Sequence, residues 1–475
     1  MSDERVIDPK NAYTWDGWGT CLSWWANTEL GTRDDLAAAL FGTDTVGVEA
    51  AGRDMALPGL GLNIVRYNLG ACTWTDGSAM VESPAIVRRK QIETFCDGDA
   101  WDWRAGANQR SMLAKAREVG ADTFEMFSVS PPWWMTVNGN PSGAEHGEQD
   151  NLEFQYQKAF ARFIAVVAGR ARDEWGIRFA SVEPFNEPSL SSWHAKQNQE
   201  GCHFTLGAQE AVIECLRGAL DERGLDDVLI AASDECHYAG AANTWRKFTA
   251  QTRRLIGRVN VHGYERDESC RSRAALRETV GDGMPIWQSE YSEGEPDGLA
   301  MALSISRDIR YLRPCGWVCW QPVEALDWGL LDGEYDDQTP NPNGGAKGTL
   351  KGQVGGVNTK YYVLAQYTRH VRPGMRILGS GHANTVAAHD PSAGRLALVT
   401  VNDGAQRTVT YDLRLLTSGT STARVRVTDT IDAPDARRYA RETDAHSRDG
   451  ILTVTHAANT VTTLELTTHG RTSGV

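Results

Sequence analysis

Short runs of β-branched and aromatic residues alternate along most of this chain with longer segments of helical periodicity. The helical segments carry apolar residues at i, i+3 and i+4 spacing, most clearly over 151–176 and 207–224. Eight runs have the alternation or the composition of strands, and 92–97 is the weakest of them. The eight runs are residues 62–70, 92–97, 122–130, 179–187, 227–233, 258–264, 285–291 and 315–322.

Strands that alternate with helices in this way predict an α/β fold, and eight such units predict a (β/α)8 TIM barrel. The main alternative is a doubly wound parallel sheet. Its phosphate-binding fingerprint is missing, because "GLGLNI" (59–64) lacks the third glycine and precedes a strand rather than a helix. The pattern therefore favours the barrel.

The pattern changes near Arg376, where alternation with a period of two begins in sequence rich in Thr and Val. Such alternation, broken by Gly, Asn and Asp, predicts an appended antiparallel β-sandwich. We expect an N-terminal segment (1–30), a barrel (31–372) and a sandwich (373–475). The N-terminal segment either adds a strand to the sandwich or folds beneath the barrel.

The chain has 475 residues and a net charge of −14. Nucleic acids and anionic membranes bind basic patches, so neither is an expected partner. No run approaches the roughly 20 apolar residues of a transmembrane helix. The N-terminus shows no apolar leader and the nine cysteines include no CxxC pair, as in proteins of a reducing cytoplasm. We expect a cytoplasmic protein, and the sequence favours no particular oligomeric state.

Sixteen tryptophans are a high number for a chain of this length. Many stand beside Gly, Pro or Asn in loop-like sequence. Core packing is the ordinary role of any single tryptophan. Several in loops predict flat walls for stacking, and the acidic net charge favours sugar rings over nucleobases as the ligand. The candidates for these walls are Trp24, Trp133, Trp134 and Trp320.

The reactive groups of barrel enzymes lie at the C-terminal ends of the strands. In this chain those ends carry two carboxylates, an amide, one cation, one imidazole and two phenols. The corresponding candidates are Glu187, Glu290, Asn186, Arg66, His262, Tyr264 and Tyr291. Two carboxylates across an apolar-walled cleft are the groups that cleave a glycosidic bond.

One carboxyl of such a pair must hold a proton for the leaving oxygen, and the other must be ionised to attack the anomeric carbon. Glu290 is expected to face Arg66 and Tyr264, which favour its charged form. We therefore assign Glu290 as the nucleophile and Glu187 as the acid/base. Asn186 is expected to donate a hydrogen bond to a sugar 2-hydroxyl.

For an isolated glutamate at a strand end, a structural ion pair is equally plausible, and Glu183 is expected to be that case. His262 is a single histidine, which we interpret as a positioning group rather than a metal ligand. The pairs Cys202-His203 and Cys236-His237 lack the spacing of a zinc site. Neither a metal nor a cofactor is expected.

With these residues in place, the chain resembles glycoside hydrolase family 30. The matching stretches are "WDGWGTCLSWWA", "IVRYNLGA", "SPPWWMTVNG", "VEPFNEP", "VHGY", "WQSEYS" and "YYVLAQYTRHVRPG". The resemblance implies a barrel with a β-sandwich, Glu187 as the acid/base and Glu290 as the nucleophile. It also implies retention of anomeric configuration through a covalent glycosyl-enzyme, with the two carboxyls roughly 5 Å apart.

Within the family, "GWGTCLSWWA" resembles the branch that cleaves β-1,6-linked galactan. Family members that act on glucosylceramide carry an acidic residue near the position of Trp24, so glucosylceramide is not the expected substrate. No basic cluster that would bind a glucuronic acid side group is visible, so glucuronoxylan is not expected either. Because polymers do not enter a cytoplasm, we expect exo action that releases β-1,6-galactobiose from the non-reducing end. The alternatives are an endo-β-1,6-galactanase, a β-1,6-glucanase, a β-xylosidase and a non-catalytic carbohydrate-binding barrel.

Overall fold

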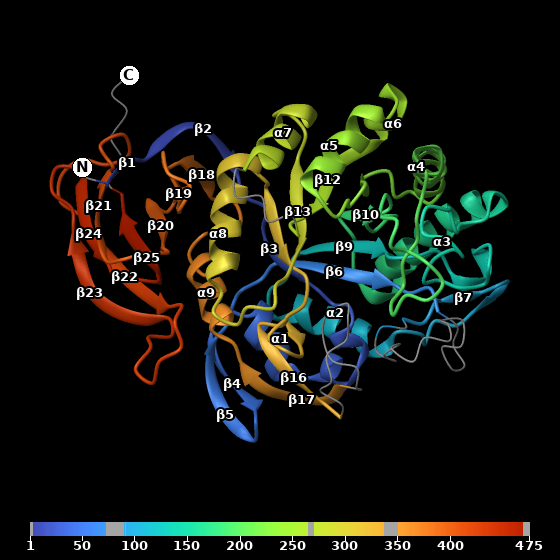
Figure 1. Cartoon of the computed structure of the whole chain (residues 1–475), viewed down its shortest axis with the longest axis horizontal. Coiled ribbons are helices and arrows are strands. Elements are labelled where there is room, and N and C mark those ends of the chain that lie inside the picture. The colour runs from blue at the N-terminus through green and yellow to red at the C-terminus, as the bar shows by residue number, and fades with distance from the viewer. Residues whose placement is uncertain (1–2, 73–89, 91, 265–269, 337–349, 469–475) are drawn as a thin grey trace.

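The computed structural model describes residues 3–72, 90, 92–264, 270–336 and 350–468. Within these residues, eight parallel strands form one closed barrel (Figure 1), as predicted. In chain order the barrel strands are β3 (Gly17–Cys21), β6 (Ile64–Leu69), β9 (Thr123–Ser128), β10 (Ser181–Glu183), β11 (Leu229–Ala231), β12 (Ile256–His262), β13 (Ile286–Tyr291) and β14 (Gly316–Cys319).

Helices follow the barrel strands and cover their outer faces, so that every strand is buried on both sides. Among the described helices, none is both long and apolar enough to cross a membrane. The helices are α1 (Asp34–Phe41), α2 (Ala107–Val119), α3 (Gln157–Arg170), α4 (Leu206–Asp221), α5 (Tyr238–Lys247), α6 (Ala250–Leu255), α7 (Arg271–Val280), α8 (Leu299–Arg307) and α9 (Thr359–Thr368).

The first barrel strand is β3, which was not predicted. The prediction of a barrel strand at 92–97 is wrong. Only Cys96–Asp97 of that run is extended, as β7 in a two-stranded sheet with β8 (Ala100–Trp101). The glycines of β3 concealed it, because glycine is a poor strand former. They are needed for close packing: a β-carbon on Gly19 would lie 2.7 Å from the Ile64 β-carbon. The barrel thus begins before residue 31, the predicted boundary.

The C-terminal strands form two facing sheets, in agreement with the predicted sandwich (Figure 1). The N-terminal strands join both of them. The smaller sheet has the order β1 (Asp3–Val6), β21 (Arg407–Asp412) and β24 (Ile451–His456). The larger sheet has the order β2 (Asp8–Thr14), β18 (Arg376–Gly379), β19 (Thr385–Asp390), β20 (Arg395–Asn402), β25 (Thr460–Thr467), β22 (Thr422–Asp429) and β23 (Ala440–His446).

The central strand β20 of the larger sheet is buried on both faces. Leu396 and Leu398 of β20 pack into the interior of the sandwich, whereas Ala397 and Val399 belong to the same apolar core as the barrel helices. This double burial follows from the sequence of β20, which is apolar at almost every position. It joins the sandwich firmly to the side of the barrel where α8 and α9 lie.

A further sheet pairs strands from residues 323–335 and 350–357, which follow the barrel strands, with strands from residues 45–58. It has the order β15 (Val323–Glu324), β16 (Leu331–Tyr335), β17 (Leu350–Val357), β4 (Thr45–Ala50) and β5 (Arg53–Pro58). Because β15 and β16 follow barrel strand β14, this sheet fixes one wall of the cavity at the C-terminal ends of the barrel strands.

Candidate active site

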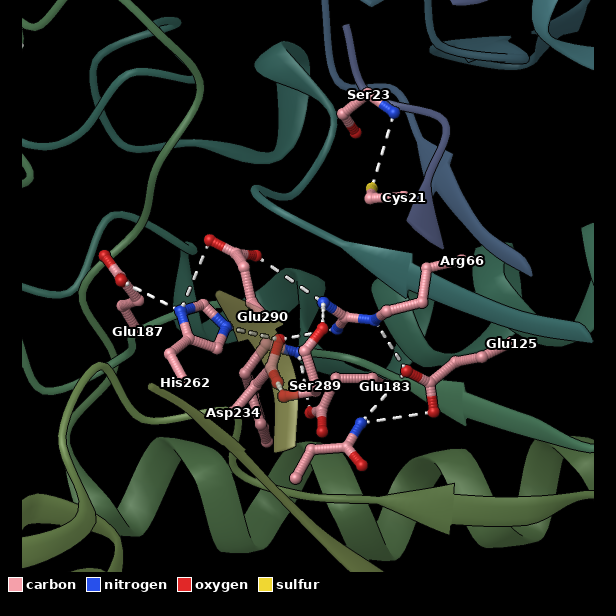
Figure 2. Close-up of polar contacts among 12 residues, drawn as sticks. Cys21, Ser23, Arg66, Glu125, Glu183, Glu187, Asp234, His262, Ser289 and Glu290 are labelled. Atoms are coloured by element: carbon pink, nitrogen blue, oxygen red, sulfur yellow. Dashed lines mark hydrogen bonds and ion pairs between the residues drawn. The ribbon is translucent and has the colours of Figure 1, made fainter. Parts of the chain in front are cut away.

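The C-terminal ends of the barrel strands bring distant side chains to one cavity of about 260 Å³. Arg66 comes from β6, Glu187 follows β10, His262 ends β12 and Glu290 lies in β13 (Figure 2). The cavity is lined by Trp24, Val129, Asn186, Glu187, Ser192, Trp193, Gln197, Gln199, Tyr264, Glu290, Trp320, Gln321, Glu324 and Trp328. Arg66 and His262 lie beneath this lining and are fully buried.

Glu187 and Glu290 face each other across His262. One oxygen of each carboxyl and a ring nitrogen of His262 all lie within 4.8 Å of one another. Both glutamates are largely buried but reach the cavity, with 8% and 5% of their surface exposed. Retaining glycosidases hold their carboxyls about 5–5.5 Å apart, whereas inverting enzymes leave about 6.5–9.5 Å for a water molecule. The separation is that of a retaining pair.

The backbone of Glu187 is held in an uncommon conformation. Its φ of 48° lies in the left-handed region, which costs a non-glycine residue free energy and recurs at functional sites. The Glu187 N–H donates to the Asp234 carbonyl at 2.9 Å, and the Trp193 indole N–H donates to the Glu187 carbonyl at 3.0 Å. These two bonds fix the turn that directs the carboxyl into the cavity.

The Glu290 carboxyl has a phenol and a cation beside it. The Tyr264 hydroxyl donates to its Oε1 at 2.8 Å, and Nη1 of Arg66 lies 3.5 Å from its Oε2. Burial raises the pKa of Tyr264 well above its usual value, so this phenol remains a neutral donor. The expected surroundings of Glu290 are therefore present.

The effect of these surroundings on protonation differs from the prediction. Burial raises the pKa of Glu290 to about 7; the charge of His262 opposes this rise, the charge of Glu187 adds to it and Arg66 opposes it. We expected Arg66 and Tyr264 to keep the carboxyl charged, but desolvation outweighs them. Two carboxyls this close lose their protons in steps that belong to the pair. The pair therefore holds one proton up to about pH 7.

His262 is a cation placed between carboxylates. Its Nδ1 lies 3.0 Å from Glu187 and 3.5 Å from Glu290, and its Nε2 lies 3.1 Å from Asp234. Burial would lower the pKa of His262, but the charges of Glu290 and Asp234 raise it well above the usual value. An imidazolium has no lone pair for a metal. In the described part of the chain, Glu187, His262 and Glu290 are the one group within metal-binding distance, and we interpret it as catalytic machinery.

Beneath the carboxyl pair, a buried ionic network fills the barrel. Arg66 donates to Glu125 at 2.8 Å and to Asp234 at 2.7 Å, and Arg258 pairs with Glu125 from the other side. Paired and hydrogen-bonded charges of this kind hold their neighbours in defined positions. Arg66 thus acts on Glu290 from a fixed place, without lining the cavity.

Comparisons with known proteins agree with this geometry. The sequence pattern described as O-Glycosyl hydrolase family 30 matches residues 10–258. The chain is 39% identical over 473 residues to Endo-beta-1,6-galactanase of Hypocrea rufa, which covers 97% of this chain and 94% of that protein. This chain belongs to glycoside hydrolase family 30. It is accordingly a retaining glycoside hydrolase.

Other relatives of this family 30 hydrolase are more distant. Exo-beta-1,6-galactobiohydrolase of Bifidobacterium longum subsp. longum is 23% identical, over 78% of this chain and 32% of that protein. A conserved exported protein from Bacteroides fragilis superimposes with a TM-score of 0.78 at 18% identity, over 97% of this chain and 99% of the other. GH30 xylanase C from Talaromyces cellulolyticus gives a TM-score of 0.69 at 17% identity, over 98% and 100%. The two structures support the fold.

Three predicted substrate-binding residues of the family 30 hydrolase lie away from the cavity. Trp133 and Trp134 form a short turn, in which the Trp134 indole donates to the Cys96 carbonyl at 2.8 Å and packs edge-on against Tyr156. Tyr291 points outward, since side chains alternate along a strand and its neighbour Glu290 points inward. Its ring packs on Trp317. These three are not among the described residues that line the cavity, and neither are Arg66 and His262, which lie beneath it. Trp24, Asn186, Tyr264 and Trp320 do line the cavity.

Several residues of the cavity wall were not predicted from the sequence as site residues. Trp193, Gln197 and Gln199 come from the long loop after β10, and Glu324 and Trp328 come from the segment after β14. Neither segment has a periodicity that indicates which side chains turn inward. Asp234, in contrast, directly follows the predicted strand 227–233, so the strand-end rule applied to the other candidates would have identified it.

Proposed function

We propose that this family 30 hydrolase cleaves internal β-1,6-galactosidic linkages of galactan chains, such as the side chains of arabinogalactan. The observation that carries this proposal is the 39% identity to Endo-beta-1,6-galactanase over nearly the whole of both chains. The walls of the cavity support it, because Trp24, Trp320 and Trp328 offer flat apolar faces to sugar rings.

The first chemical step assigns a role to each carboxyl. The ionised Glu290 attacks the anomeric carbon, while Glu187 gives its proton to the departing glycosidic oxygen. A covalent glycosyl ester forms on Glu290, and the shortened chain leaves with a new hydroxyl. Arg66 and Tyr264, which contact the Glu290 carboxyl, support its assignment as the nucleophile.

The second step reverses these roles. Glu187, now ionised, takes a proton from water, and the resulting hydroxide attacks the anomeric carbon from the side that the leaving group vacated. The ester bond breaks and the Glu290 carboxylate is released. Two inversions at one carbon give net retention. The short distance between the carboxyls suits this sequence, because no water is needed between Glu290 and the sugar.

The mode of cleavage that we propose differs from the expectation drawn from the sequence. Exo action rested on the absence of a visible leader, which carries no information about the cavity, and the comparisons do not support it. The match to an exo-acting protein is weaker, at 23% identity, and covers 32% of that protein. Endo action is therefore the proposal, and exo release of galactobiose is the second candidate.

A product time course on β-1,6-galactan tests both parts of the proposal. Endo cleavage produces a ladder of oligosaccharides from the first minutes, whereas exo cleavage produces one short product throughout. The matched controls are β-1,6-glucan and an aryl β-xyloside. Turnover of either control with none of galactan would overturn the substrate, and a single product from galactan would overturn the mode. Binding without turnover would indicate a carbohydrate-binding barrel.

We expect kcat/KM to fall as the pH rises through about 7. Burial raises the pKa of Glu290 to about 7, and above that pH both carboxyls of the pair are ionised, so no proton remains for the leaving oxygen. The pH profile of kcat/KM on a galacto-oligosaccharide measures this decline. The variant Glu187→Gln carries no titrating proton at that position, and its remaining activity should lack the decline.

Replacing Trp24 by alanine should lower kcat/KM about 10- to 100-fold, because burial of an aromatic face against a ligand contributes about 1.5–3 kcal/mol. Trp24 lines the cavity, with its ring edge-on to Trp320 at 5.3 Å. Kinetics on a galacto-oligosaccharide measure the loss.

The matched control for Trp24→Ala is Trp134→Ala. The Trp134 indole packs on Tyr156, away from the cavity, so this variant should lower the melting temperature and leave KM unchanged. The reverse pattern, with unchanged kinetics for Trp24→Ala and raised KM for Trp134→Ala, would contradict the assignment.

A further inference from the structure

Asp234 is a buried carboxylate placed under the site. It lies in the loop after β11, which ends at Ala231, its side chain has no exposed surface, and it does not belong to the described residues that line the cavity. It therefore does not touch the substrate. Its φ of 57° lies in the left-handed region, a second uncommon backbone conformation beside that of Glu187. Nothing in the mechanism described above uses this carboxylate.

The carboxylate of Asp234 holds the two cations that act on the catalytic pair. Its Oδ2 accepts from Nη2 of Arg66 at 2.7 Å and lies 3.1 Å from Nε2 of His262. Its Oδ1 accepts from the Ser289 hydroxyl at 2.5 Å. One oxygen thus orients the guanidinium that approaches Glu290 and the imidazolium that faces both carboxyls. The other oxygen is tied to the residue before Glu290 (Figure 2).

The backbone of Asp234 holds the remaining catalytic residue. Its carbonyl accepts from the Glu187 N–H at 2.9 Å, and its own N–H donates to the Asn260 carbonyl at 3.2 Å. Asp234 is therefore bonded through its main chain to the turn of Glu187. Through its side chain it is bonded to the groups around Glu290.

The charge of Asp234 is held in place by its neighbours. Burial alone would raise its pKa, but the charges of Arg66 and His262 lower the pKa well below the usual range, so the group is an anion at every pH of interest. The other titratable groups that face Asp234 or His262 are Arg66, Glu183, Glu187, Tyr264 and Glu290.

We propose that Asp234 is a positioning residue that joins the two catalytic carboxyls into one unit. It keeps His262 charged and fixes Arg66, and through its carbonyl it fixes the turn that carries Glu187. This proposal rests on the roles proposed above for Glu187 and Glu290. It predicts that loss of the Asp234 charge changes the protonation of the pair, which loss of a merely structural contact would not do.

The test is Asp234→Asn, which keeps the shape and removes the charge. The amide oxygen can still accept from Arg66 and face His262 at the Oδ2 position, with the amide NH2 directed at the Ser289 hydroxyl, so the variant chiefly removes the negative charge that holds the two cations. We expect kcat/KM to fall about 100-fold, the effect of roughly 1 Å of misplacement. We also expect the pH profile to move to higher pH by about one unit.

The direction of this shift follows from the charges around Glu290. The His262 cation lowers the pKa of Glu290 more than the Asp234 anion raises it. Loss of the Asp234 charge lowers the pKa of His262, because that charge is one of those that raise it. Once His262 loses its proton, the larger of the two effects on Glu290 is lost, and the carboxyl pair titrates at higher pH. The ¹⁵N resonances of labelled His262 measure its protonation directly and require no substrate.

Two further variants keep the test decisive if Asp234→Asn folds poorly. Ser289→Ala removes the bond to Oδ1 and leaves the Asp234 charge, so it should lower kcat/KM with the pH profile in place. Glu183→Gln is the matched control. Burial raises the pKa of Glu183 well above its usual value and so favours the neutral form, and replacing this buried carboxyl by an amide should leave the profile unmoved.

The outcomes separate this proposal from the proposed function. A wild-type enzyme without activity on β-1,6-galacto-oligosaccharides would contradict the function, while the ¹⁵N titration would still decide the role of Asp234. If the wild-type enzyme is active, the proposed function stands whatever the variants do. If His262 then stays protonated and the pH profile stays in place in Asp234→Asn, the positioning role is overturned. An unchanged kcat/KM in Ser289→Ala, or a pH profile that moves in this variant, would also overturn it.

Discussion

Replacing Glu290 by alanine is expected to lower kcat/KM by at least about 10,000-fold, or more than about 5 kcal/mol of transition-state stabilisation. The variant lacks the group that forms the glycosyl ester, while the cavity and the acid remain. Glu290 lies in the middle of a rigid barrel, where no other described carboxyl lines the cavity within reach of His262 except Glu187. Initial rates on β-1,6-galacto-oligosaccharides and on an aryl β-galactoside measure the loss.

Azide provides the decisive readout for Glu290→Ala. The anion enters the space left by the carboxylate, attacks the anomeric carbon and displaces the aglycone in a single step, so the product is the α-galactosyl azide. The matched control is Glu293→Gln, because Glu293 is equally buried nearby but bonds to Tyr291 outside the cavity. Wild-type rates in Glu290→Ala, or a β-azide from it, would contradict the assignment.

Replacing Glu187 by alanine should lower kcat/KM on natural linkages about 1,000-fold, within the range of lost general acid catalysis. Substrates that carry a dinitrophenolate leave without a proton, so formation of the glycosyl ester from them should slow less than about tenfold. The ester then accumulates, because no base activates water. A burst of dinitrophenolate followed by a slow steady rate is the measurement that reports this imbalance.

Azide should accelerate Glu187→Ala as well, with the opposite stereochemistry. It replaces water in the second step, attacks the sugar held on Glu290 and releases the β-galactosyl azide. The two variants thus give different anomers of one product, which assigns each carboxyl to its face of the sugar. The same anomer from both would show that the roles are misassigned. The control Glu183→Gln, four residues earlier, should give no azide product.

The barrel was predictable because seven of its strands are buried on both faces and read as apolar runs between amphipathic helices. The eighth was missed because β3 consists of "GWGTC", whose glycines are required by contacts with β6 that only the folded structure reveals. The sandwich was predictable from alternation. Whether residues 1–30 add a strand to it or fold beneath the barrel stayed open, since the pairing of β1 with β21 joins strands that the barrel separates in the sequence.

The carboxyl pair was predictable because parallel strands end at one edge and Glu187 and Glu290 stand at such ends. The protonation of the pair was not predictable, because it depends on whether the loss of solvation of Glu290 outweighs the charges beside it. The sequence of Glu290 shows the neighbours but not its burial. The aromatic residues divided in the same way: Trp24 and Trp134 look alike in sequence, and only the folded chain places one in the cavity and the other against Tyr156.

Pairing of the first strands with the last has a consequence for biosynthesis. Strands β1 and β2 are translated before the barrel, but their partners β21 and β18 are translated only after it. Until then the early strands expose unsatisfied edges, which invite aggregation. A nascent chain arrested before residue 407 would therefore lack the strand that pairs with β1.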